Sequence, residues 1–175
     1  LDSKTQMTAT EQLQAIYKQV RSLLPRKVKA YSKLIEKLSA QGLEQVSFKN
    51  LSDQDFAYLK VYFEKEIMPL TSPQIVDKRQ PFPFLKNKGI YVGVRIASKS
   101  GAVRLGIISA EGHFSRVVFL PGREGKVRFV LAEDLICYFA EKIFNRHDVL
   151  EKVVFRITRN ADIDVEDEMG DVDFD

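Results

Sequence analysis

The chain has 175 residues, of which 45% are apolar and 29% charged, and its formal net charge is +3. This length corresponds to one domain, with or without an extension, and is enough to bury a core. No apolar run approaches the roughly 20 residues that a membrane-spanning helix needs, and the start at Leu1 has neither a methionine nor a signal-like apolar stretch. We therefore expect a piece cut from a longer cytoplasmic protein.

A long helix is predicted near the start of the chain. Thr8-Ala9-Thr10-Glu11 is a capping box, in which the threonine and glutamate side chains satisfy unpaired N–H groups at a helix start. Apolar residues then recur at three- and four-residue spacing until Gly42, a residue suited to a helix C-terminus. Because proline lacks an N–H and clashes with the preceding turn, we expect Pro25 to split or sharply kink this helix near Leu24.

A second helix is predicted after a short strand. Val46-Ser47-Phe48 alternates like a strand, and Ser52 then offers an N-cap, followed by acidic residues that favour a helix start. The helix should run from about Asp53 to Ile67 and end at Pro69. One face of it is apolar and is predicted to be buried: Phe56, Leu59, Phe63 and Ile67.

A proline-rich connection follows at residues 69–88. Its four prolines remove backbone donors and restrict φ, which argues against a central strand or a helix. We expect an extended segment tied down by Phe82, Phe84 and Leu85.

From Gly89 the apolar period changes from that of a helix to that of strands. Short β-branched runs are separated by Gly or Ser turns, which predicts an antiparallel meander: residues 90–96, 103–108, 114–119 and 126–130. Residues 131–144 are predicted to be helical, and residues 152–158 form a further strand. The predicted class is α+β, an N-terminal helical pair followed by a mainly antiparallel sheet with a packed helix. The expected divisions are a helical segment at 1–68, the connection at 69–88, and the sheet and helix at 89–175.

The charge is unevenly distributed along the chain. Residues 162–175 contain eight acidic residues and no basic one, so residues 1–161 carry 27 basic residues against 16 acidic ones, a net charge of +11. A basic body with an acidic end indicates a polyanionic partner, or charge pairing within a larger protein. The acidic end matches no calcium loop and is predicted to be solvated.

Common catalytic signatures are absent from the sequence. It has no Walker phosphate loop, no paired Cys or His spacing for a metal, and no Gly-x-Ser-x-Gly elbow. The glycines of Gly122-Arg123-Glu124-Gly125-Lys126 are predicted to form a hairpin turn. Cys137 is the single cysteine, which excludes an internal disulfide, and we expect a plain buried thiol. No catalytic and no metal-binding residue is predicted.

Two distant stretches resemble a known family. They are residues 62–69, YFEKEIMP, which run on through Asp77 to Pro81-Phe82-Pro83-Phe84, and residues 155–162, FRITRNAD. Together they resemble the long polyphosphate kinase family of bacteria, and specifically its non-catalytic middle part, the head domain. The resemblance covers roughly residues 8–175 in the same order.

The resemblance implies an activity for a longer parent protein. Members build inorganic polyphosphate from ATP with Mg²⁺, through a phosphorylated histidine in a later domain of the chain. Neither His113 nor His147 lies in a motif like the one that surrounds that histidine, so both are predicted to be solvated loop residues. The fragment alone should be inactive and need no cofactor. The implied partners are inorganic polyphosphate, the catalytic domains of the same chain and a second copy in a homodimer, with membrane association of the full enzyme left open.

The candidate binding residues are arginines and phenylalanines. Arg116, Arg156 and Arg159 could guide polyphosphate, because guanidinium groups bind phosphate oxygens in forked geometry. The alternative, which we favour, is that they pair with Asp134, Asp162 or Asp164 and hold strand ends together. Phe82 and Phe84, held between prolines, are predicted with equal weight to form a subunit interface or part of the core.

Two other functional classes remain open from sequence. The +11 body permits a free-standing module for polyanions or nucleic acid, although basic residues are scattered and no RNA-binding aromatic string or helix-turn-helix pattern is present, so nucleic acid is not the first choice. A scaffold whose charges only solubilise it is the third reading.

Overall fold

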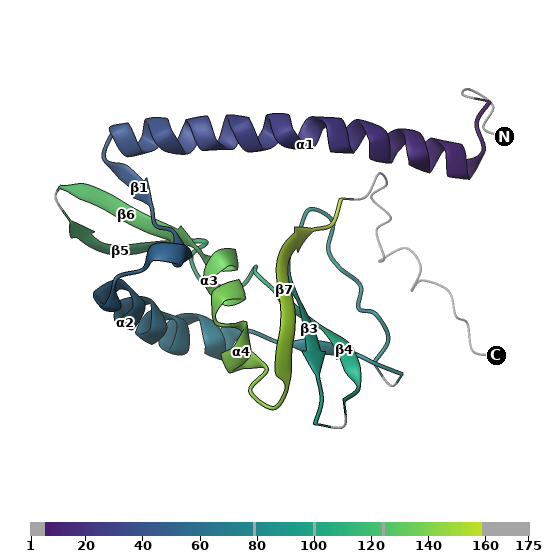
Figure 1. Ribbon diagram of the computed structural model, residues 1–175. Coiled ribbons are helices and arrows are strands. Elements are labelled where there is room, and N and C mark those ends of the chain that lie inside the picture. The colour runs from purple at the N-terminus through teal and green to yellow at the C-terminus, as the bar shows by residue number, and fades with distance from the viewer. Residues whose placement is uncertain (1–5, 79, 100, 124, 159–175) are drawn as a thin grey trace, which may run out of the picture. The chain divides into compact units, whose positions relative to one another are not determined.

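The structure, a computed structural model, describes residues 6–158 apart from positions 79, 100 and 124 (Figure 1). This part of the chain divides into two compact units. The first holds the described residues up to Gln45 together with Pro121–Arg128, and the second holds Val46–Leu120 and the described chain from Phe129. Each unit is described by itself.

The first unit is built on helix α1, Ala9–Ala40. The predicted capping box is confirmed: the Thr8 hydroxyl accepts a hydrogen bond from the Glu11 N–H at 3.3 Å, and the Thr8 N–H donates to Glu11 Oε2 at 2.8 Å. The helix ends as expected at Gly42, which has φ +82°, a value that glycine adopts at little cost.

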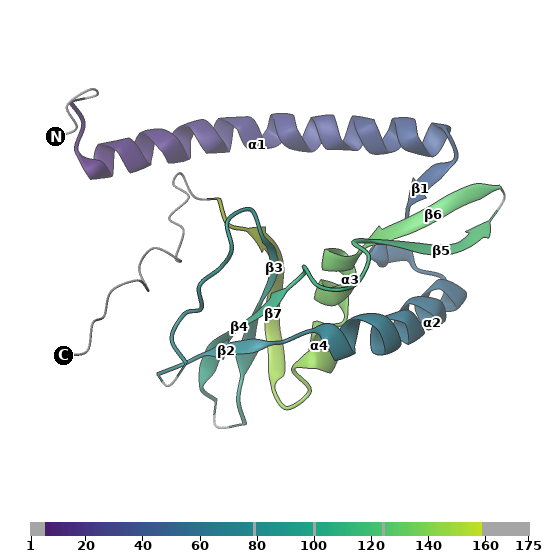
Figure 2. The same ribbon diagram turned by 180° about the vertical axis from the view of Figure 1, so that it is seen from behind.

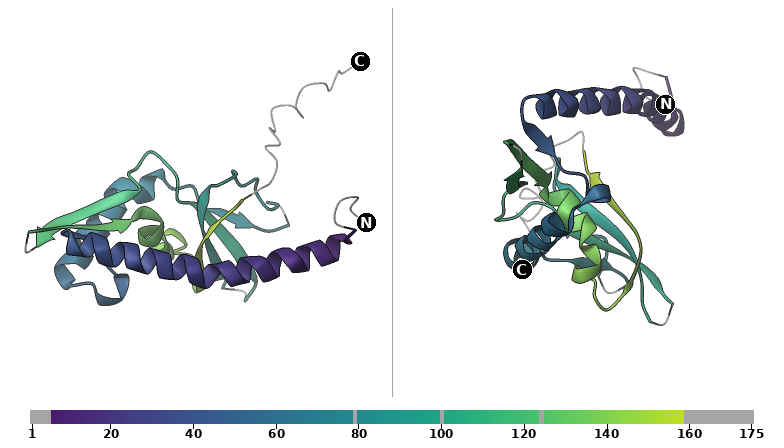
Figure 3. Two further views of the ribbon diagram at one scale, coloured as in Figure 1. Left: turned by 90° about the horizontal axis from the view of Figure 1, so that it is seen from above. Right: turned by 60° about the vertical axis from the view of Figure 1, so that its left-hand side comes forward.

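The predicted break at Pro25 is wrong. The helix continues through Pro25, and Figure 3 (left) shows it as one unbroken element. A proline removes only one backbone hydrogen bond from the ladder, and here the capped N-terminal half and the following half are each several turns long. Those turns keep the helix continuous.

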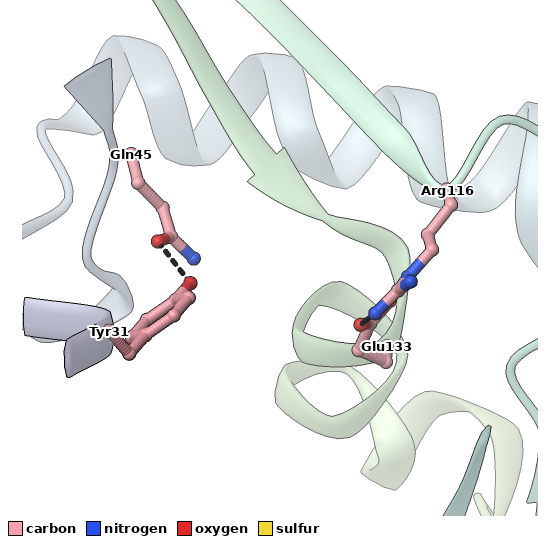
Figure 4. A network of polar contacts seen from close by, with 4 residues as sticks. All are labelled: Tyr31, Gln45, Arg116 and Glu133. Carbon is pink, nitrogen blue, oxygen red and sulfur yellow. Dashed lines mark hydrogen bonds and ion pairs between the residues drawn. The ribbon is translucent and has the colours of Figure 1, made fainter. Parts of the chain in front are cut away.

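Helix α1 is tied to the short strand β1, Leu43–Gln45. The Tyr31 hydroxyl donates to Gln45 Oε1 at 2.6 Å (Figure 4), and the Val127 N–H on strand β6, Lys126–Leu131, donates to the Gly42 carbonyl at 2.8 Å. Strands β1, β6 and β5, Val117–Arg123, form a three-stranded sheet in that order. The strand predicted at residues 46–48 is found earlier, as β1 at Leu43–Gln45. Ser47 instead caps a 3₁₀ turn, Phe48–Asn50.

The second unit begins with a capped helix. The Ser52 hydroxyl accepts from the Asp55 N–H at 3.2 Å and so starts α2, Asp53–Tyr62, as predicted. The helical path continues to residue 67 as a π-turn, Phe63–Ile67, and then a 3₁₀ turn, Met68–Leu70. Of the predicted apolar face, Leu59, Phe63 and Ile67 are fully buried, whereas Phe56 stays 39% exposed.

Four antiparallel strands form the main sheet of this unit, in the order β2-β4-β3-β7 (Figures 1 and 2). They are β2, Gln74–Val76; β3, Ile90–Ala97; β4, Val103–Ser109; and β7, Asp148–Arg156. The predicted single meander is wrong, because β5 and β6 belong to the other sheet. Strand β4 pairs with β3 along one edge and with β2, which comes from the proline-rich connection, along the other.

Two short helices cover one face of this sheet, α3, Ala132–Tyr138, and α4, Ala140–Ile143 (Figure 3, right). They confirm the helix predicted at 131–144, with an interruption at Phe139. The core between helices and strands is apolar and includes Val92, Val94, Ile96, Leu135 and Ile136. The observed class is α+β, as predicted.

A close approach between helix and sheet shapes this core. A Cβ atom at Gly106 on β4 would lie 2.5 Å from Cζ of the buried Phe144, which follows α4. Only glycine leaves room for this ring over the strand.

The proline-rich connection is anchored differently from the prediction. Leu85 is buried beside Tyr91 and Ile107, but Phe82 and Phe84 are 57% and 63% exposed. Leu85 therefore ties the segment to the core by burial, as predicted, whereas Phe82 and Phe84 are mostly exposed.

Candidate functional site

Arg116 lies just before β5 and is bound to the start of α3. Its carbonyl accepts from the Ala132 N–H at 2.8 Å, and its guanidinium holds Glu133 through Nε–Oε1 (3.1 Å), Nε–Oε2 (3.2 Å) and Nη2–Oε1 (2.6 Å) (Figure 4). This forked contact with the Glu133 carboxylate raises the pKa of Arg116.

The two side chains of this pair differ in burial. The Glu133 side chain is 6% exposed, whereas that of Arg116 is 61% exposed. A buried carboxylate without a cation would be costly, so Arg116 neutralises Glu133 from the surface. The favoured prediction of a structural role for Arg116 had named Asp134 as a partner; the ion pair is made with Glu133 instead.

Sequence reasoning missed Glu133, although a signal was present. Glu133 falls three residues before Ile136, which places both on one face of α3, and both are buried. A carboxylate on an apolar face requires a cation, and that rule could have identified the pair. The neighbouring Asp134 is half-buried, and burial raises the pKa of its carboxyl.

The other predicted arginines are placed elsewhere. Arg156 is exposed at the end of β7, opposite Ile90 on β3, whereas Arg116 lies in the segment before β5 and in no strand. Strand pairing therefore does not bring Arg156 and Arg116 together. Arg159, with Asp162 and Asp164, lies outside the described residues.

The predicted interface residues lie on the exposed proline-rich segment. Pro81, Pro83 and the neighbouring backbone of β2 line a small concavity of about 320 Å³ beside them. Phe82 and Phe84 present large apolar surface there, in a segment whose prolines restrict its conformations.

The remaining candidate groups do not form a catalytic cluster. His113 lies in an exposed loop, as predicted, whereas His147 lies in a bend and is half-buried. Burial raises the pKa of the half-buried Cys137 thiol, which fits the expected unreactive residue. Among the residues that the structure describes, no group of three His, Cys, Asp or Glu side chains could hold a metal ion.

Sequence reasoning also failed to group a second basic site. Lys99, Arg146 and His147 line one hollow together with Asn145 and Asp148, although nearly fifty positions separate Lys99 from the others. None of these residues had been linked by a motif.

The described residues thus define an α+β module in which the forked ion pair of Arg116 and Glu133 is structural. A family model described as "Polyphosphate kinase middle domain" matches residues 54–174. The chain belongs to the polyphosphate kinase family and corresponds to the middle domain of its members.

Individual relatives agree with this assignment. The polyphosphate kinase of Halalkalibacterium halodurans is 34% identical over 170 residues, which are 95% of this chain and 24% of that protein. The polyphosphate kinase of Staphylococcus epidermidis is 33% identical over 168 residues, which are 95% of this chain and 22% of that protein. The chain therefore spans about a quarter of the length of the curated relatives it matches.

The fold is also similar to a solved one. The crystal structure of polyphosphate kinase from Porphyromonas gingivalis superposes with a TM-score of 0.70 at 20% identity, covering 88% of this chain and 25% of that chain. No helix in the described part of the chain is long and apolar enough to cross a membrane.

Proposed function

We propose that this chain is the non-catalytic head region of a cytoplasmic ATP:polyphosphate phosphotransferase. The parent reaction transfers the terminal phosphoryl group of ATP to polyphosphate, giving ADP and a polymer longer by one unit. The observation that carries the proposal is the match to polyphosphate kinases over 95% of the chain, within which the middle-domain match covers residues 54–174.

Catalysis belongs to other parts of the parent protein. The parent would use ATP, Mg²⁺ and a phosphorylated histidine in a later domain, whereas neither His113 nor His147 lies in a motif like the one that surrounds that histidine. Radiolabelled ATP with Mg²⁺ and a polyphosphate primer tests this division. Labelled polymer should form with the full-length protein and not with residues 1–175, and polymer made by the fragment would refute it.

The head region also serves dimer contacts through Phe82 and Phe84. Two exposed aromatic rings on a proline-restrained segment bind a partner with little loss of conformational entropy. Sedimentation of the full-length protein with Phe82→Ser and Phe84→Ser should give a weaker dimer than the parent. A matched change of exposed apolar residues on α2, Tyr58→Ser and Val61→Ser, should leave the dimer intact.

A role in the polyphosphate path rests mainly on Arg156 and Arg159. Arg116 contributes through its exposed outer edge, because Nε and Nη2 are engaged by Glu133. Labelled polyphosphate should bind residues 1–175 at low salt, and the double change Arg156→Ala and Arg159→Ala should weaken that binding. Equal binding by the folded double variant would remove these two arginines from the path.

A second function, a polyanion or nucleic-acid-binding module, is kept because residues 1–161 carry a net charge of +11. Competition decides between the two. Polyphosphate should displace DNA of matched phosphate content from the fragment, and a preference for DNA would favour the nucleic-acid module.

A further inference from the structure

A hollow of about 550 Å³ opens at the end of the main sheet where β3 ends and β7 begins. Figure 1 shows these two strands. Two loops line it. One is the turn after β3, with Lys99, next to Ala97 at the strand end. The other is the connection from α4 to β7, with Asn145, Arg146 and His147, next to Asp148 at the strand start.

Strand register brings the two loops together. Ala97 is the last residue of β3 and pairs with Asp148, the first residue of β7. A register shift lies just inside this edge, between Arg95 and Ile96, and such bulges increase strand twist and redirect side chains. The two loops therefore lie side by side because β3 and β7 are paired at this end of the sheet.

Backbone hydrogen bonds fix both loops. The His147 N–H donates to the Phe144 carbonyl at 2.9 Å, and Phe144 is buried in the core. The Gly101 N–H donates to the Ser98 carbonyl at 2.8 Å, which closes the turn that carries Lys99. Each of the two loops thus has a backbone hydrogen bond beside the hollow.

Lys99 and Arg146 differ from three paired cations of the main sheet and its helices. On the same unit, Arg95 pairs with Glu151 at 3.0 Å, Lys142 with Glu64 at 2.7 Å and Lys152 with Glu141 at 3.0 Å. Within the described part of the chain, Lys99 and Arg146 make no ion pair, and both side chains are exposed toward solvent.

We propose that this hollow binds a linear condensed phosphate. Arg146 supplies a planar fork that matches phosphate oxygens, Lys99 supplies a mobile ammonium, and Asn145 and His147 offer further N–H donors. The volume falls within the range of small-molecule sites and admits more than one phosphate group.

Asp148 lines the same hollow and opposes an anion. Lys99 and Arg146 exceed this carboxylate by one formal charge, so binding is modest and sensitive to salt. The same residue gives a second test, because removing its charge should strengthen binding.

This site adds a binding residue set to the proposed function. The identity of its natural ligand rests on that proposed function. Recognition of phosphate by these residues needs no turnover and can be measured on the 175-residue chain. A full-length protein that makes no polymer would refute the proposed function and leave this site standing.

The experiment is a calorimetric titration of residues 1–175 with tripolyphosphate at low salt. Lys99→Ala with Arg146→Ala should weaken binding by about tenfold. Lys49→Ala with Lys65→Ala removes the same charge from exposed positions outside the hollow and should change binding by less than about twofold. Asp148→Asn should tighten it. Equal loss in both double variants, or no gain with Asp148→Asn, would overturn the proposal.

Two further readouts locate and classify the ligand. Tripolyphosphate should shift the amide resonances of residues 97–99 and 145–148, and shifts confined to other residues would overturn the proposal. ATP should bind about as well as tripolyphosphate if the phosphate chain is what the hollow recognises. Binding of ATP alone would mean that the site reads the nucleoside, and would overturn the proposal too.

Discussion

The Arg116 guanidinium reaches from the loop before β5 to hold the buried carboxylate of Glu133, seventeen residues later, with a shortest contact of 2.6 Å. Both residues belong to the second unit, where the pair joins the segment before β5 to the first turn of α3. The main role of Arg116 is therefore to stabilise the fold, whether or not the exposed side of its guanidinium also binds a ligand.

Replacing Arg116 should therefore destabilise the fold. Arg116→Ala leaves the Glu133 carboxylate buried without a cation, and we expect a loss of about 1–3 kcal/mol in the free energy of unfolding. The loss is smaller than that of a wholly buried pair because Arg116 is 61% exposed and its interaction is screened. Urea denaturation measures the change.

The double variant provides the control for that change. Glu133→Gln removes the buried charge, so adding it to Arg116→Ala should recover part of the lost stability. A double variant whose loss equals the sum of the two single losses would show that the pair contributes nothing as a unit.

Ser52→Ala should destabilise the second unit by about 1 kcal/mol, because the Ser52 hydroxyl accepts the Asp55 N–H at the start of α2. Ser47→Ala, which removes a cap from a three-residue 3₁₀ turn, should cost less. Midpoints of denaturant unfolding compare the two, and equal midpoints for Ser52→Ala and the parent would contradict the cap's role.

Gly106→Ala should destabilise the protein by about 1–3 kcal/mol, because its new methyl group would lie 2.5 Å from the ring of Phe144. Phe144→Leu by itself removes the ring and should lower stability, because the buried volume is lost. Combined, the two changes should cost less than their sum in thermal unfolding. Strict additivity would show that the ring moves aside freely.

Cys137 should react slowly with alkylating reagents. Burial raises the pKa of its thiol, and only the thiolate is nucleophilic, so the pH of half-maximal reaction should lie above that of an unfolded cysteine. Lys152 acts in the opposite direction but more weakly. Alkylation rates across pH, with the protein in denaturant as reference, check this. A half-maximal pH below the denatured value would identify an activated thiol.

Helix ends were the features predicted best from sequence. The caps at Thr8, Ser52 and Gly42 lie where their residue types indicated, because a cap depends on hydrogen bonds between residues at most a few positions apart. Pro25 was misread because its effect depends on the stability of the turns around it, which a single residue does not reveal.

Strand partners were predicted less well. The runs predicted at 114–119 and 126–130 are found as β5, which begins later at Val117, and β6, yet both lie in a sheet with β1, while β2 and β7 complete the other sheet. The alternating pattern of a strand shows which side is apolar and leaves the neighbour undetermined.

The sequence by itself determined the class, the helix caps and the family resemblance, because these depend on residue types at short and regular spacing. Only the tertiary structure decided that Glu133 is the partner of Arg116 and that Lys99 and Arg146 share one hollow. Such groupings follow from strand register, as in the pairing of Ala97 with Asp148, between residues far apart in the chain. The free energy of that pairing comes from burial of the whole sheet face, which no local pattern contains.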